Sequence, residues 1–251
     1  MSLAELVYDP YAYELHDDPY PTYRRLRDEA PVYRNEERGF WALSRHADVV
    51  DAFRDSARFS SAHGVSLDPA APGPHAHRTM SVLAMDEPMH GRIRGLVARG
   101  FTPRRVAEME PHIRELTRGY LDRILDEGPI DFIGDLAGRL PMDVISELIG
   151  VPPADRDEVR RLSDLLVHRE EGTHDVPPAG VAAALELVTY YSEMLAERRR
   201  QPTQDLTSAL MAAEVDGDRL TDDEIMGFLF LMVVAANETT TKLLGTAWGW
   251  A

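Results

Sequence analysis

The chain has 251 residues, no cysteine and a formal net charge of −16, from 27 basic and 43 acidic side chains. This acidity argues against nucleic-acid binding, which needs a basic surface, and the lack of cysteine excludes disulfides and thiolate zinc sites. The first residues lack the basic start and apolar core of a signal peptide. The longest apolar run, Ile225–Ala236, is shorter than the roughly 20 residues that span a bilayer. We therefore expect a cytoplasmic protein that binds neither nucleic acid nor membrane.

The first 60 residues predict a small sheet between short helices. Residues 21–30 predict a helix, and residues 31–34 and 40–43 predict two strands joined by a tight turn. Ser44 is placed to cap the helix that follows. Residues 60–80 are dense in Gly, Pro, Ser and His and predict a long irregular loop, a feature that is uncommon in compact domains unless it is functional or disordered.

Beyond this loop the pattern is helical. Residues 103–127 predict a helix that Thr102 caps and whose first residue is a proline, which suits a first helical turn. Residues 132–149 predict a second helix, which Pro141 should kink because proline cannot donate a backbone hydrogen bond. The remaining helices before the last one are predicted over residues 155–167, 181–200 and 206–214.

The last helix carries the clearest signals. Thr221 followed by Glu224 predicts a capping box at its start. The run Ile225–Ala236 is apolar on all sides, which predicts a helix buried on every side. At roughly 1.5 Å per residue, a helix over 221–251 would be about 46 Å long, so we expect it to cross the centre of the body. We find no repeat or linker, and predict one mainly helical domain over residues 1–251.

The apolar run of this helix ends abruptly in the sequence AANETTTK. Threonines are poor helix formers, and their hydroxyls can bond back to a carbonyl one turn earlier. A buried carboxylate costs several kcal/mol unless it is paired, so these residues in a buried helix indicate a functional site. Ala235 and Ala236 leave room for a flat ligand, Thr239 offers a hydroxyl, and Glu238 can relay protons. The alternative is that the helix simply emerges into solvent at Asn237.

A second candidate lies in the sequence MDEPMHGRIRGLVARGFTPRRV. His90 and Arg94 are four residues apart, so on a helix they share a face. Two potential cations on one face suit a pair of carboxylates, because an arginine guanidinium can donate two parallel hydrogen bonds to a carboxylate. The spacing alone is more typical of a solvated face that carries one histidine and three arginines.

Taken together, the two segments resemble the cytochrome P450 family of haem-thiolate monooxygenases. AANETT resembles the family's oxygen-activating motif, with Ala236 where glycine is commoner. MDEPMHGRIRGLVARGFTPRRV resembles its propionate-binding helix, with Asp-Glu-Pro in place of Asp-Pro-Pro. The segments DPYPTYRRLRDEAPVYR and RLTDDEIMGFLFLMVVAANETTT also resemble the family, so that the resemblance covers essentially the whole chain. It implies the cytochrome P450 fold, mainly α, with a helical body, a small N-terminal sheet and a long central buried helix.

The resemblance also implies roles for the candidate residues. Glu238 and Thr239 would be catalytic and deliver protons to the oxygen that is being activated. The cofactor, haem, would contact Ala235 and Ala236, and its propionates would bind His90 and Arg94. The loop 60–83 and the helical pair 155–200 would cover the substrate. The positions implied for the substrate pocket are Val82, Leu83, Leu231 and Val234.

The family needs more chain than this, including a cysteine that ligates the iron, since a thiolate ligand promotes O–O cleavage. This chain has no cysteine and stops within an apolar helix, so we expect it to be the front part of a longer protein and inactive by itself. The parent would insert one oxygen atom of O2 into an apolar small molecule, with electrons from a ferredoxin-type donor and its reductase. The alternative is a haem-free scaffold that binds and activates a partner enzyme. The retained pairs Glu238–Thr239 and His90–Arg94 favour the oxygenase.

Overall fold

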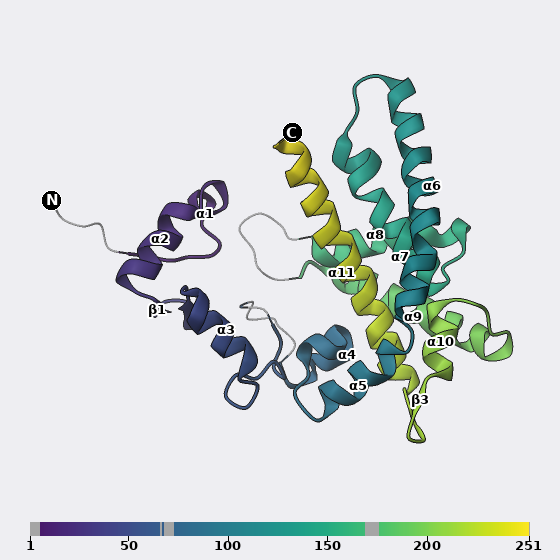
Figure 1. Ribbon diagram of the computed structural model, residues 1–251, viewed down its shortest axis with the longest axis horizontal. Coiled ribbons are helices and arrows are strands. Elements are labelled where there is room, and N and C mark those ends of the chain that lie inside the picture. Colours follow the sequence, from purple (N-terminus) through teal and green to yellow (C-terminus); the bar gives the residue numbers. More distant parts are fainter. Residues whose placement is uncertain (1–5, 66, 68–72, 169–175, 251) are drawn as a thin grey trace. The chain divides into compact units, whose positions relative to one another are not determined.

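The computed structural model describes residues 6–65, 67, 73–168 and 176–250 (Figure 1). The chain forms two compact units, Met1–Ser60 and Ser61–Ala251. The architecture is mainly helical with a small antiparallel sheet near the N-terminus, as the sequence predicted. The expectation of one domain over 1–251 stays a prediction.

The first unit contains the predicted small sheet. Its strands pair antiparallel, with Val32 opposite Leu43 and Asn35 opposite Phe40. The ring of Tyr8 lies edge-on to three other aromatic rings of this unit and helps to hold the strands against the helices. The elements are α1 (Tyr13–Asp17), α2 (Tyr20–Glu29), β1 (Val32–Asn35), β2 (Phe40–Leu43) and α3 (His46–Arg54).

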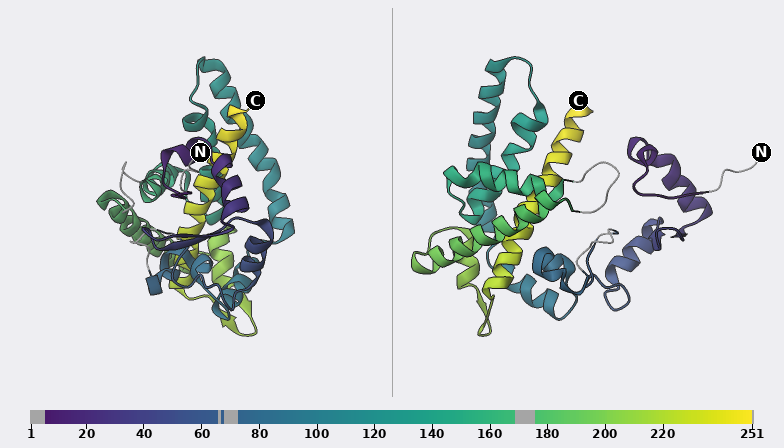
Figure 2. Two further views of the ribbon diagram at one scale, coloured as in Figure 1. Left: turned by 90° about the vertical axis from the view of Figure 1, so that its left-hand side faces the viewer. Right: turned by 180° about the vertical axis from the view of Figure 1, so that it is seen from behind.

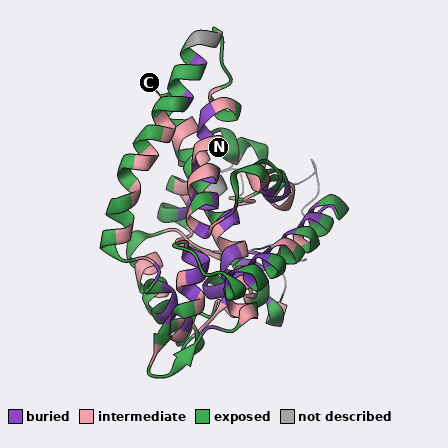
Figure 3. Ribbon diagram, turned by 90° about the vertical axis from the view of Figure 1, so that its right-hand side faces the viewer, coloured by how far each residue is buried: buried purple, intermediate pink, exposed green. Residues whose placement is uncertain are grey.

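The second unit is a layered set of helices with one short hairpin. Figure 3 shows buried residues gathered where its helices cross and exposed residues along the outer faces. Its elements before the long α9 are η1 (Gly73–His75), α4 (His77–Met80), η2 (Ser81–Ala84), α5 (Met89–Ala98), α6 (Pro103–Glu127), η3 (Ile133–Ala137), α7 (Arg139–Ile149), η4 (Pro153–Asp155) and α8 (Arg156–Val167). Those that follow are α9 (Pro178–Arg200), α10 (Leu206–Ala212), β3 (Glu214–Val215), β4 (Asp218–Arg219) and α11 (Asp222–Gly249).

Two helix starts follow the local sequence, whereas the expected cap by Ser44 is wrong: α3 begins after Arg45, and the Ser44 hydroxyl donates to the Pro31 carbonyl instead. The Thr102 hydroxyl accepts a hydrogen bond from the Arg105 amide at 3.3 Å, so α6 begins where its cap predicts. At α11 both halves of the predicted capping box form, because Thr221 accepts from the Glu224 amide and Glu224 accepts from the Thr221 amide. These local bonds satisfy amides that lack a partner in the first turn of any helix.

Two stretches differ from the sequence prediction. Residues 73–84, expected within or beside an irregular loop, form three short helical turns, and α4 packs on α11. The predicted helix over 132–149 is divided into a π-helical turn, η3, and the α-helix α7. The Gly138 amide bonds to the Ile133 carbonyl five residues earlier, and Pro141 falls in the first turn of α7. A proline there removes no helical hydrogen bond, so the expected kink is replaced by the division at Gly138.

Helix α11 runs through the middle of the second unit and contacts α4, α7, α8, α9 and α10 (Figure 2). Ile225, Phe228, Leu229 and Val233 are buried within the main apolar cluster. At Gly227 the helix approaches α4 so closely that an added Cβ would lie 2.9 Å from the Arg78 carbonyl oxygen. The predicted central position of this helix is therefore observed for its first three turns. Among the helices in the described residues, none combines the length and apolarity that crossing a membrane requires.

The second half of α11 is largely exposed, in agreement with the alternative that the helix emerges into solvent at Asn237. The expected burial of Ile225–Ala236 on every side is wrong at Ala235, which is exposed. Leu243 is 69% and Trp250 is 87% exposed. η3 packs against one side of this half of α11. The Thr241 hydroxyl donates to the Ala137 carbonyl at 3.0 Å, and the rings of Trp248 and Phe132 stack with their centroids 4.6 Å apart. The reason is that the helix extends past the neighbours that bury its first half.

A buried ion pair joins the ends of α7, α9 and α10. The Arg198 guanidinium donates to Asp205 at 2.6 Å and to the Gly150 carbonyl at 2.7 Å, and the two side chains are 10% and 7% exposed. Burial raises the pKa of Asp205, but hydrogen bonds from Thr203, Ser208 and Arg198 outweigh it and hold the pKa below its ordinary value. The carboxylate therefore contributes stability in its charged form.

We predict that Asp205→Asn lowers the free energy of unfolding by about 3 kcal/mol near pH 7, since it leaves a buried guanidinium without its counter-charge. The pKa of Asp205 in the folded protein lies below its unfolded value of about 3.9. The loss of unfolding free energy in the variant should therefore be complete above about pH 4 and should become smaller as the pH falls further. Urea unfolding of wild type and variant between pH 7 and pH 2 measures this. Asp157→Asn is the control, since Asp157 pairs with Arg160 at an exposed position. A deficit that stays constant down to pH 2 would contradict the assignment.

Candidate functional site

The first group of candidate residues lies on α5. Ile93, Leu96 and Val97 are buried on one side of this helix, whereas Arg94 is exposed and His90 is half-buried at the edge of the buried side. His90 Nδ1 lies 3.6 Å from a Glu87 carboxylate oxygen. Arg94 is exposed and has no ion pair or hydrogen bond with any residue that the structure describes. The predicted shared face is therefore present, and one of its two cations is available for an anionic group.

Arg92 lies between the two candidates and was not singled out in the sequence. Its guanidinium donates to Asp218 at 2.5 and 2.9 Å, to Glu224 at 2.5 Å and to the Arg219 carbonyl at 3.0 Å. Hydrogen bonds to Asp218 and then to Glu224 raise the pKa of Arg92 further above its ordinary value. Helix α5 is thereby joined to the β3–β4 hairpin and to the first turn of α11. The predicted solvated face of arginines is in this respect wrong.

No local pattern could have identified this role. Arg92 lies 126 residues before Asp218 and 132 before Glu224, and the three meet only because the hairpin folds back on α5. The signal in the sequence was limited to the capping box, whose Glu224 side chain accepts from Arg92 as well as from the Thr221 amide.

The second group lies on α11, where the structure separates neighbouring candidates. Ala235 and Thr239 are exposed and four residues apart, so they share one face. The Thr239 hydroxyl donates to the Ala235 carbonyl at 2.8 Å, which is the bond to the preceding turn that the sequence predicted. Ala236 is turned the other way and packs against the main apolar cluster. Glu238 lies within α11, but its side chain is outside the described residues.

Two of the four predicted substrate positions belong to the main apolar cluster. Val82 on η2 is buried in the main apolar cluster, and Leu231 packs against that same cluster. η2 also packs on α11, so the loop and the helix share one apolar surface. Leu83 is exposed and Val234 is half-buried. Val82 and Leu231 therefore belong to the same apolar cluster, whereas Leu83 lies at the surface.

These residues fit a flat group that carries carboxylates. Ala235 presents only a methyl group on the open face of α11, which permits close approach to the helix backbone. Arg94 offers its guanidinium fork, which matches carboxylate geometry. Haem has both properties, and its propionates suit cations on the exposed face of α5. No cluster of three or more His, Asp or Glu that could bind a metal ion is found in the described part of the chain, and the sequence supplies no cysteine.

Known proteins that are similar to this chain include several cytochromes P450. The chain is 62% identical over 247 residues to a protein of Mycobacterium tuberculosis (strain H37Rv) that is named cytochrome P450 123, and it covers 61% of that protein's length. It is 37% identical to the vitamin D(3) 25-hydroxylase of Pseudonocardia autotrophica, of which it covers 59%. The solved structure of the cytochrome P450 PksS of Bacillus subtilis superposes with a TM-score of 0.83 at 31% identity, over 96% of this chain and 62% of that one. The chain thus spans about three fifths of the length of these relatives, and no family model matches it.

We predict that Arg92→Gln lowers the free energy of unfolding by about 1–2 kcal/mol, a value reduced from that of a buried pair because Arg92 is about one third exposed. The variant should also increase amide hydrogen exchange in α5 and in the first turn of α11, because it releases the contact between them. Arg114→Gln is the control: Arg114 pairs with Glu110 where both side chains are about two thirds exposed, and its loss should have little effect. Equal exchange in wild type and Arg92→Gln would show that Arg92 does not hold these helices together.

Proposed function

This chain belongs to the cytochrome P450 family, and on that premise we propose that it forms the N-terminal part of a haem-dependent monooxygenase that inserts one oxygen atom of O2 into an apolar small molecule. The observation that carries the proposal is the open face of α11, where Ala235 leaves space and Thr239 places a hydroxyl beside it.

We propose that His90 and Arg94 bind the propionates and that Ala235 and Ala236 flank the haem. Haem supplies the redox chemistry of oxygen activation when it is bound. The residues of this chain orient the haem through the positive charge on α5 and leave room for it on α11. The exposed, unpaired guanidinium of Arg94 supports this role because no bond to a described residue has to be broken first.

Thr239 is the residue that we propose holds and passes a proton. Its hydroxyl donates to the Ala235 carbonyl, so both oxygen lone pairs remain free to accept a hydrogen bond on the open face. Rotation about χ1 would let the same hydroxyl donate outwards instead. We propose that Glu238, the preceding residue, relays protons to it from water.

We propose an apolar substrate that lies against Leu231, Val234 and the segment Val82–Leu83. The apolar character of these four side chains supports this, since an apolar surface excludes water from the reacting atoms. A relative named vitamin D(3) 25-hydroxylase supports the same substrate class. Electrons would come from a ferredoxin-type donor with its reductase, and a cytoplasmic location stays a prediction.

We predict that Thr239→Ala in the complete oxygenase lowers the product formed per electron pair consumed by at least about tenfold, because a positioned proton donor contributes about 10²-fold or more. Thr240→Ala is the matched control, since it removes the neighbouring hydroxyl, which lies about 100° away around the helix. NADH consumption and product are measured together. If Thr239→Ala forms as much product per electron pair as the wild type, Thr239 has no role in proton transfer. If both variants lose product equally, the loss comes from a change in helix structure and not from the Thr239 hydroxyl.

A second prediction concerns the 251-residue chain itself. Mixed with haem and reduced under carbon monoxide, it should not give the absorption spectrum of thiolate-ligated haem, because it contains no cysteine. His90→Gln combined with Arg94→Gln should weaken whatever haem uptake the chain shows. A thiolate-type spectrum would contradict the first expectation. Uptake that is the same with and without the two cations, or absent altogether, would favour the haem-free scaffold.

A further inference from the structure

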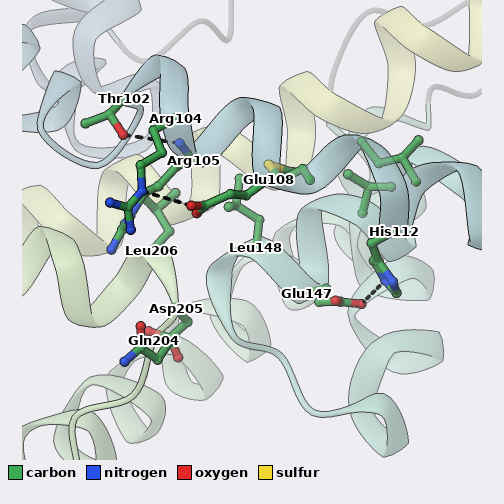
Figure 4. A pocket seen from close by; sticks show the side chains of 13 residues that line it. Thr102, Arg104, Arg105, Glu108, His112, Glu147, Leu148, Gln204, Asp205 and Leu206 are labelled. Atoms are coloured by element: carbon green, nitrogen blue, oxygen red, sulfur yellow. Dashed lines mark hydrogen bonds and ion pairs between the residues drawn. The ribbon is translucent and has the colours of Figure 1, made fainter.

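A cavity of about 740 Å³ lies between α6, α7 and the segment that leads into α10 (Figure 4). This volume is within the range of roughly 300–1,000 Å³ that is typical of small-molecule sites. None of the residues assigned to haem, proton transfer or substrate lines it. The cavity is therefore a separate feature of the second unit.

One wall of the cavity is apolar. It is built from side chains on three helices, four of them half-buried and one, Leu206, fully buried. Half-buried apolar side chains that converge on a concave surface are typical of ligand sites, where a bound molecule completes their burial. The five apolar residues of this wall are Met109, Ile113, Val144, Leu148 and Leu206.

The carboxylates that line the cavity are all neutralised by cations of the same chain. Each has a partner within 3.4 Å, so none of them leaves a negative charge uncompensated. The pairs are Glu108 with Arg104 at 2.8 Å, Glu147 with His112 at 2.8 Å and with Arg156 at 3.4 Å, and Asp205 with Arg198 at 2.6 Å.

Arg105 is the lining cation that remains. It is half-buried, and its guanidinium makes one long hydrogen bond, 3.5 Å to the Gly100 carbonyl, with no carboxylate partner among the residues that the structure describes. A partly desolvated guanidinium without a counter-ion attracts an anion more strongly than an exposed one, because less water screens it. Arg105 is therefore the lining cation that is left to pair with a bound anion, and it lies at the α6 end of the cavity.

We propose that this cavity binds an amphipathic carboxylate of medium chain length. The carboxylate accepts hydrogen bonds from Arg105, and the alkyl chain lies along the apolar wall. From Arg105 to Ile113 the wall follows α6 for about 12 Å, at roughly 1.5 Å per residue, which sets the length of the tail. The inference does not depend on the proposed oxygenase function, because it uses none of the same residues.

The test is isothermal titration calorimetry of the 251-residue chain with decanoate, kept below its micellar range, and with decanol, which has the same tail but no charge. The wild-type chain should bind decanoate at least about tenfold more tightly than decanol, a difference of about 1.4 kcal/mol. Arg105→Gln should abolish that preference, and Arg105→Lys should retain part of it. Val144→Gln should weaken the binding of both ligands, because it makes the wall polar.

Arg114→Gln is the matched control, since Arg114 is also on α6 but outside this cavity. It should leave both affinities unchanged, and circular dichroism confirms that each variant keeps its helix content. Three results would overturn the proposal: no decanoate binding by the folded wild type, equal affinity for decanol, or an Arg105→Gln variant that binds decanoate as the wild type does. A loss of preference in Arg114→Gln equal to that in Arg105→Gln would show a general charge effect and would also overturn it.

Discussion

The bridge made by Arg92 sets the geometry on which the candidate site depends. One guanidinium joins α5 to the β3–β4 hairpin and to the first turn of α11, through Asp218 and Glu224. His90 and Arg94 lie two residues to either side of it, so their positions follow from the same contact. From Glu224, α11 reaches Ala235 after about 16 Å and Thr239 after about 22 Å, at roughly 1.5 Å per residue. The cations and the hydroxyl are thus placed by one bridge and one rigid helix.

Helix α11 changes its character along its length, and the candidate residues lie where it changes. Up to Val233 the apolar side chains are buried or half-buried against α4, α7 and their neighbours. From Ala235 onwards one face is open, and Thr239 meets its own hydrogen-bonding need through the helix backbone. A hydroxyl that is satisfied locally can be released by rotation of a single side-chain torsion, which suits a group that must exchange protons.

The exposed side of α5 and the cavity beside α6 differ in how their charges are balanced. On α5, Arg94 is exposed and unpaired within the described residues, whereas around the α6 cavity each carboxylate has a partner and Arg105 alone has none. We propose that Arg94 and Arg105 bind anions because neither has a carboxylate partner among the described residues. Arg92 and Arg198, whose charges are fully matched, contribute to the fold instead.

The sequence by itself determined what depends on near neighbours. Thr102 and Thr221 start their helices through bonds to residues three positions on, and the Thr239 bond to Ala235 spans one turn, so short-range pattern sufficed. The motifs around His90 and Thr239 likewise identified the family, because their residue types and spacing are local. Only the tertiary structure decided that Arg92 is a bridge, that Ala235 and Ala236 lie on different sides, and that the second half of α11 is exposed. These features depend on contacts between residues up to 132 positions apart, and a linear pattern cannot specify which distant side chain will meet a given charge.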